Sequence, residues 1–111
     1  MKVNQLINDA YTTAKMHGWH DQDRSVGDLI CLMHSELSEA LEEHRNGRLP
    51  HEVYYNPSRP NKPEGIPIEL ADCVIRIMDF CGLHQINLEE AIATKMEYNK
   101  TRPYRHGNKK V

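Results

Sequence analysis

The chain has 111 residues, of which 14 are Lys or Arg and 16 are Asp or Glu, giving a net charge of -2. This length fits one domain spanning residues 1–111, and the charge balance argues against a protein whose main role is to neutralise a nucleic-acid backbone. The sequence contains neither a membrane-spanning apolar stretch nor a signal-peptide core, so we expect a cytoplasmic protein with no membrane partner. Cys31, Cys73 and Cys81 lie in apolar patterns, which predicts buried free thiols.

The spacing of apolar residues predicts four helices. Ser25 and Asn87 begin capping sequences ahead of the second and fourth helices, and Gly18 and Gly82 are predicted to end the first and third. The predicted helices span residues 3–17, 26–45, 66–81 and 88–101.

Residues 48–67 contain five of the six prolines and show neither helical nor strand periodicity. We predict a long Pro-rich loop here, between the second and third helices. Tyr54 and Tyr55 either cover a site as part of a lid or lie in an exposed insert. Because no segment alternates between apolar and polar residues, the predicted fold is an all-α helical bundle of four main helices, followed by a basic tail at 103–111.

Two acidic motifs fall within predicted helices: Glu36-Leu37-Ser38-Glu39 in the second and Glu69-Leu70-Ala71-Asp72 in the third. Residues three apart lie on the same helix face, so each pair can offer oxygens to one cation. Antiparallel packing of the two helices would bring all four carboxylates together, and Mg²⁺ prefers such hard oxygen ligands. The alternative is that both acidic stripes are ordinary solvated helix faces.

The fourth helix carries polar groups on its apolar side, namely Lys95, Asn99 and Arg102. A buried Lys95 requires a counter-charge, either an acid of the cluster or a ligand phosphate. Alternatively, its ammonium reaches solvent along the apolar surface.

Two further residues have alternative roles. Trp19 follows a predicted helix end and either stacks on a nucleotide base or fills the core. Arg76 is expected to pair with Asp72 or Asp79 across one helical turn, which is a structural role.

These motifs resemble those of the MazG-like all-α nucleoside triphosphate pyrophosphohydrolases, relatives of dimeric dUTPases and dCTP pyrophosphatases. The family pattern is E-x-x-E followed by E-x-x-D, and here 29 residues separate the two motifs. Lys95 and Asn99 resemble the family's closing K-x-x-x-N segment. The Pro-rich insert at 48–67 departs from the compact members of the family.

The resemblance implies hydrolysis of a (deoxy)nucleoside triphosphate to the monophosphate and pyrophosphate, a nucleotide-pool housecleaning reaction. It also implies a homodimer or homotetramer, with Mg²⁺ or alternatively Mn²⁺ as cofactor. Glu39 would additionally orient or deprotonate the attacking water. The implied metal ligands are Glu36, Glu39, Glu69 and Asp72, and the implied substrate contacts are Lys95, Asn99 and Arg102, with Trp19 as a stacking candidate.

The rival interpretation is a non-enzymatic helical module that binds nucleic acid or nucleotide through its basic C-terminal segment, which has five Lys or Arg and no acid after Glu97. For the enzyme we expect no stable nucleic-acid partner. The rival predicts salt-sensitive polynucleotide binding without Mg²⁺, whereas the enzyme predicts Mg²⁺-dependent turnover of mononucleotides.

Overall fold

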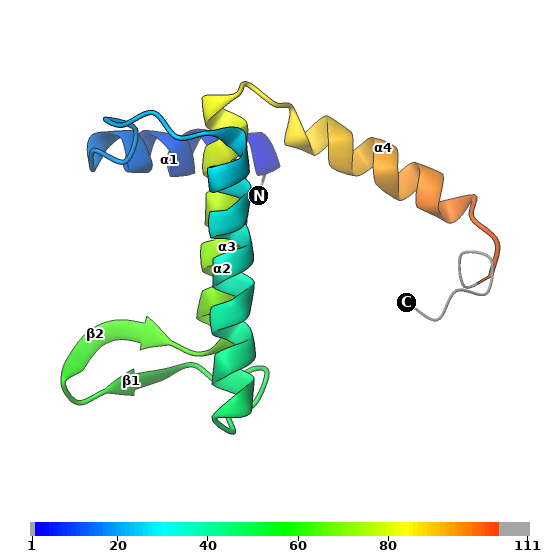
Figure 1. The fold of residues 1–111 in the computed structure, drawn as a ribbon. Coiled ribbons are helices and arrows are strands. Elements are labelled where there is room, and N and C mark those ends of the chain that lie inside the picture. The colour runs from blue at the N-terminus through cyan, green and yellow to red at the C-terminus, as the bar shows by residue number, and fades with distance from the viewer. Residues whose placement is uncertain (1, 105–111) are drawn as a thin grey trace.

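A computed structural model describes residues 2–104 of the chain, which form four helices and a small antiparallel hairpin (Figure 1). The predicted basic tail lies mostly outside the described residues, because 105–111 are not among them. Within residues 2–104, no helix is long and apolar enough to cross a membrane. The elements in chain order are α1 (Val3–Met16), α2 (Val26–Arg45), β1 (Tyr54–Asn56), β2 (Arg59–Glu64), α3 (Ile66–Leu83) and α4 (Leu88–Lys100).

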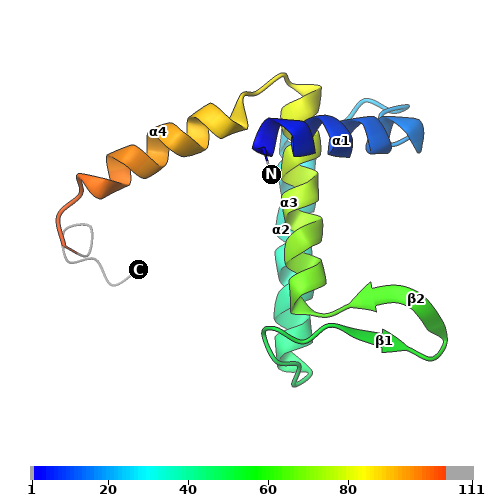
Figure 2. The ribbon, with the colours of Figure 1, turned by 180° about the vertical axis from the view of Figure 1, so that it is seen from behind.

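Helices α2 and α3 lie side by side and run in opposite directions, forming the central column of the fold (Figures 1 and 2). Leu29 and Ala40 of α2 and Cys73 of α3 are buried. The Cys73 thiol donates to the Met33 carbonyl oxygen at 3.5 Å. This antiparallel pairing is the arrangement that the acidic motifs require in order to meet.

Helix α1 crosses one end of this column and packs against α3 (Figure 2). The core there is built from Ile7, Met78 and Cys81. Gly82 lies inside α3 rather than ending it, and a Cβ at this position would lie 2.5 Å from the Cβ of Tyr11. The absent side chain at Gly82 therefore lets α1 approach α3 closely.

The predicted helix starts are confirmed by their caps. The Ser25 hydroxyl accepts a hydrogen bond from the Asp28 N–H, and the Asn87 side chain accepts one from the Glu90 N–H. Each satisfies a backbone donor that the first helical turn leaves unpaired. Gly18 follows α1 with φ +79°, a conformation that glycine adopts without steric cost.

The segment between α2 and α3 differs from the predicted loop, because β1 and β2 pair there as an antiparallel hairpin. Residues 55–62 are exposed, so this ribbon has no buried face to impose an apolar–polar alternation. Pro60 and Pro63 are compatible with β2 because a two-stranded ribbon leaves part of its backbone unpaired. The fold is thus mostly helical with a small two-stranded sheet.

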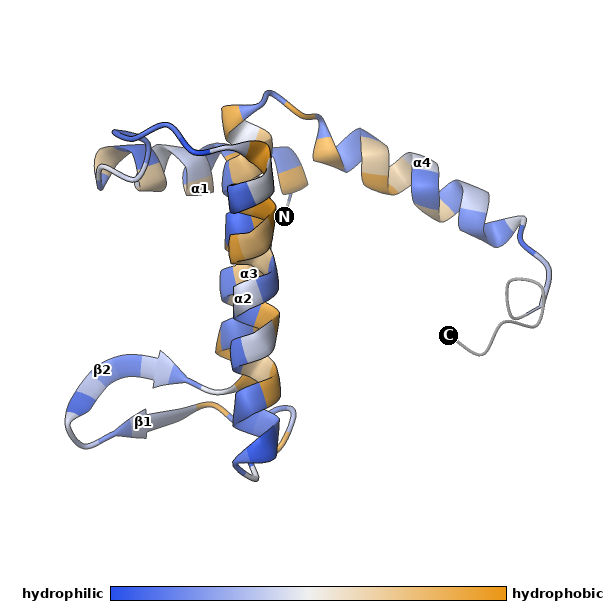
Figure 3. Ribbon diagram, in the orientation of Figure 1, coloured by the Kyte–Doolittle hydropathy of each residue, from blue (hydrophilic) through white to orange (hydrophobic). Residues whose placement is uncertain are grey.

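Helix α4 contacts α1 near its own beginning and then extends away from the column (Figure 1). The Val3 N–H donates to Glu89, and the Asn4 side chain donates to Asn87. Apolar residues, orange in Figure 3, occur along the column and on α4, and several of them are exposed. They include Leu37, Leu41, Leu70, Val74, Ile75, Ile92 and Met96.

The three cysteines are free, and two of them fit the sequence prediction. Cys73 and Cys81 are buried, whereas Cys31 is exposed and the prediction of a buried thiol is wrong there. Cys31 lies on a face of α2 that residues 2–104 leave uncovered.

Candidate functional site

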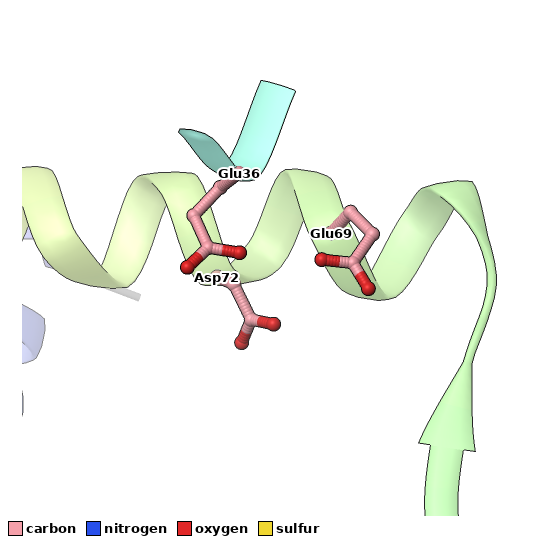
Figure 4. Close-up of side chains that lie close together, drawn as sticks. All are labelled: Glu36, Glu69 and Asp72. Carbon is pink, nitrogen blue, oxygen red and sulfur yellow. The ribbon is translucent and has the colours of Figure 1, made fainter. Parts of the chain in front are cut away.

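Three acids from the two predicted motifs meet midway along the α2–α3 column (Figure 4). Glu36 comes from α2, and Glu69 and Asp72 come from α3. One carboxylate oxygen from each lies within 4.8 Å of the others. The three-residue spacing of Glu69 and Asp72 places both on one helix face, and the antiparallel partner helix supplies Glu36. We call these three residues the acidic cluster.

Glu36 is fixed in place by Arg76. The Arg76 Nε donates to the Glu36 Oε1 at 2.7 Å, and the Glu36 side chain is 9% exposed. Burial raises the pKa of Glu36, but the hydrogen bond and positive charge of Arg76, together with hydrogen bonds from Glu39 and Glu69, hold that pKa below its usual value. The expected pairing of Arg76 with Asp72 or Asp79 is wrong, because its partner lies on the neighbouring helix.

Glu69 carries an unsatisfied oxygen. Its Oε2 is buried and has no hydrogen-bond partner among residues 2–104. Burial, and after it the proximity and charge of Glu39, raises the pKa of Glu69 to about 8. A carboxylate in this position is costly to ionise unless a cation lies beside it.

The pKa of Asp72 is also raised, first by burial and then by the charge of Glu36. Arg76 and Lys62 oppose this rise with their positive charges. Glu39, the fourth predicted acid, is exposed and lies outside the group of three. Because its charge still raises the pKa of both Glu69 and Asp72, Glu39 lies at the solvent edge of the acidic cluster.

A cleft of about 320 Å³ opens beside Glu36 and Asp72. Trp19 lines it together with Ala14, so the end of α1 and the following turn form one wall. The Arg24 guanidinium lies 3.8 Å from the centre of the Trp19 ring. Trp19 is half-buried and lies on the wall of the cleft that contains Glu36 and Asp72.

The wall that carries Trp19 is held by a polar pair that the sequence analysis did not single out. His20 Nε2 lies 2.8 Å from Asp79 Oδ1, and both side chains are largely buried, at 14% and 10% exposure. The Tyr11 ring lies 5.2 Å from the His20 ring. The sequence signal was limited to Asp79, which was considered only as a possible partner of Arg76.

The three predicted substrate contacts on the C-terminal side are not brought to the acidic cluster. Lys95 lines a separate, shallow hollow along α4, with its Nζ 4.8 Å from the Tyr98 ring. Arg102 approaches the same ring at 5.9 Å, and Asn99 is exposed. Within one chain, α4 extends away from the column and cannot complete the site (Figure 1).

Comparison with known proteins gives no match to any family model, curated protein or solved structure.

Proposed function

We propose that the protein is a nucleoside triphosphate pyrophosphohydrolase that uses a divalent cation held by the acidic cluster. The observation that carries this proposal is the convergence of three carboxylates, one with an orphaned oxygen, at the edge of a cleft lined by an aromatic ring. The motif resemblance to the MazG-like enzymes supports the same reaction.

The donor set of the acidic cluster suits Mg²⁺ or Mn²⁺. All its donors are carboxylate oxygens, and the Glu69 Oε2 has no partner within residues 2–104. Glu36, Glu69 and Asp72 would hold the ion. When bound, such an ion neutralises phosphate charge and lowers the pKa of a coordinated water.

The chain's own side chains would supply the remaining tasks. Glu39 lies at the solvent edge of the acidic cluster, where a carboxylate can orient a water molecule or accept its proton. Arg76 keeps Glu36 ionised and oriented. Trp19 offers an aromatic surface on which a nucleobase can stack.

The proposal includes a second copy of the chain, in a homodimer or homotetramer. The apolar residues exposed on α2 and α3 are numerous for an isolated chain, with Val74 at 50% and Ile75 at 48% exposure. Among residues 2–104, most of helix α4 likewise packs against no other element (Figure 3). Association would cover these faces and form the helical bundle between subunits, with Lys95, Asn99 and Arg102 of one subunit reaching the acids of another.

The test is a panel of ribo- and deoxyribonucleoside triphosphates with Mg²⁺ or with EDTA, in which pyrophosphate and orthophosphate are measured separately. We expect pyrophosphate release that EDTA abolishes and that falls at least 100-fold in Glu39→Gln and in Asp72→Asn. Glu42→Gln, an exposed change on the same helix, should retain wild-type activity.

Absence of turnover on every nucleotide would refute the enzyme proposal. The same protein should then be tested for polynucleotide binding in EDTA at low and high salt. Tight binding that weakens steeply with salt would favour the rival nucleic-acid-binding module.

A further inference from the structure

The cleft beside the acidic cluster extends along α3 toward the end of the column that α1 crosses (Figure 2). Asp72, Arg76 and Asp79 of α3 all line it. Asp72 and Asp79 are seven residues apart, close to two full turns, so they lie on nearly the same face of the helix and about 10 Å apart along its axis. The cleft therefore has the acidic cluster at one end and Asp79 at the other.

Asp79 is a buried acid that the proposed reaction does not use. Its side chain is only 10% exposed, and burying a carboxylate is costly unless hydrogen bonds replace the lost water. His20 supplies one such bond, with its Nε2 at 2.8 Å from Asp79 Oδ1. Because an ionised carboxylate can only accept, the His20 Nε2 is the donor. A carboxylate has lone pairs on both oxygens, so the bond at Oδ1 leaves Oδ2 able to accept a second hydrogen bond.

The Asp79 end of the cleft is also its aromatic end. Trp19 and Asp79 both line the cleft, and both also line a small void of about 10 Å³ next to Phe80, so the two side chains are neighbours. The hydrogen bond between His20 and Asp79 ties the residue that follows Trp19 to α3. A planar base resting against the Trp19 ring would accordingly lie within reach of the Asp79 carboxylate.

We propose that Asp79 determines base specificity: its Oδ2 accepts a hydrogen bond from the exocyclic amino group of cytosine or adenine. The amino groups at C4 of cytosine and C6 of adenine are donors, whereas uracil and hypoxanthine carry a carbonyl oxygen at these positions. A carbonyl oxygen facing the carboxylate would place two acceptors together with no proton between them, which costs affinity. This inference rests on the proposed function in taking the ligand to be a nucleoside triphosphate.

The competing role for Asp79 is to hold the Trp19 turn against α3 through His20 without touching the base. A structural role of this kind predicts that Asp79→Asn and His20→Gln weaken the binding of all nucleotides alike. Recognition of the base predicts a change in selectivity instead. The asparagine amide oxygen still accepts from His20, while its NH2 group becomes a donor, which suits an oxo base and opposes an amino base.

The test is calorimetric titration of the full chain, with Mg²⁺ present, with the α,β-imido analogues of dCTP and dUTP and of dATP and dITP. The imido bridge resists cleavage between the α- and β-phosphates, so binding is measured without turnover. Each pair differs only in the amino or oxo group and the protonation of the adjacent ring nitrogen. We expect wild type to bind the amino member of at least one pair more tightly by about 10-fold or more, and Asp79→Asn to reduce that ratio by about 10-fold or more.

Two control variants accompany Asp79→Asn. His20→Gln removes the ring but keeps the acceptor, so it should weaken both members of a pair together and keep their ratio within about 3-fold of wild type. Asp9→Asn, an exposed change on α1, should keep every affinity within about 2-fold of wild type. Circular dichroism of each variant establishes that its fold is intact.

Equal affinity of wild type for the amino and oxo members of both pairs would overturn the inference, and this result needs no variant. An unchanged ratio in Asp79→Asn would also overturn it, as would a wild type that binds none of the four analogues. Failure of the proposed function is a separate result, because it means no pyrophosphate release from any nucleotide. A wild type that prefers the amino bases through Asp79 without hydrolysing nucleotides would sustain the inference and refute the enzyme.

Discussion

The Glu69→Gln substitution should stabilise the metal-free protein at high pH and should remove the stabilisation that a divalent cation gives to wild type. Glutamine has nearly the shape of the protonated carboxyl but stays neutral at every pH. In the metal-free protein Glu69 has a pKa of about 8, against 4.5 for an ordinary glutamate. Protonated Glu69 therefore stabilises the folded state fully below pH 4.5, and this contribution is lost as the pH rises toward 8.

The pKa shift of Glu69 determines how large the stability difference between wild type and Glu69→Gln should be. If one group carried the whole shift, it would correspond to about 5 kcal/mol. Glu69 shares its shift with neighbouring acids and is not fully buried, so we expect roughly 2–3 kcal/mol. Glu69→Gln should accordingly match wild type near pH 4.5 and exceed it by this amount near pH 9.

Addition of Mg²⁺ should narrow the stability difference between wild type and Glu69→Gln at high pH. A site with a dissociation constant of about 1 mM contributes about 1.4 kcal/mol of stability at about 10 mM Mg²⁺. Wild type should gain that stabilisation, whereas Glu69→Gln has lost a charged ligand and should gain little. In wild type, Mg²⁺ binding below pH 8 should also release a proton, because Glu69 must ionise to bind the ion.

The assay is urea unfolding of wild type, Glu69→Gln and Glu42→Gln at intervals from pH 4.5 to pH 9, with and without Mg²⁺. Glu42 is exposed on α2, so its variant should parallel wild type in every condition. If the difference in unfolding free energy between wild type and Glu69→Gln were constant across the pH range, Glu69 could not be a carboxyl group whose ionisation destabilises the folded state. Equal stabilisation of both proteins by Mg²⁺ would refute its role as a ligand.

Three other substitutions test packing and association. Val74→Glu should halve the particle mass measured by light scattering, or reduce it further, whereas Met16→Glu at the exposed end of α1 should not change it. Gly82→Ala should destabilise the fold by about 1–3 kcal/mol in urea unfolding, because the new Cβ meets the α1 side chain that packs there, and Gly27→Ala, where a Cβ has room, should not. Arg76→Gln should cost about 2–4 kcal/mol at pH 7 and less at pH 4, because it leaves a buried carboxylate without its cation.

The acidic cluster could be predicted because its geometry follows from helical periodicity. Glu69 and Asp72 share a face in any α-helix, and antiparallel packing of the two helices was the condition for Glu36 to join them. The partner of Arg76 could not be predicted in this way. Sequence spacing predicts which residues are neighbours on the same helix. The contact of Arg76 with Glu36 depends instead on how α2 is rotated about its axis relative to α3.

The apolar–polar pattern of the sequence could predict neither the hairpin nor the position of α4, for two different reasons. A strand is recognised by alternation between a buried and an exposed face, and most of the ribbon is exposed on both faces. Helix α4 does have an amphipathic pattern, broken by Lys95 and Asn99, but a pattern does not specify which surface the helix covers. That choice depends on tertiary contacts, which helical periodicity alone does not specify.

The charges around the site account for the kind of ligand that it can accept. Four carboxylates gather there, counting Glu39 with the acidic cluster, and two cationic side chains, Arg76 and Lys62, lower the pKa of Asp72. Full ionisation would leave two negative charges uncompensated. In the metal-free protein, the raised pKa of Glu69 relieves this excess by retaining a proton. A bound divalent cation would offset the two remaining charges, so the residues that make the metal-free site unstable at high pH are those that would favour a bound cation.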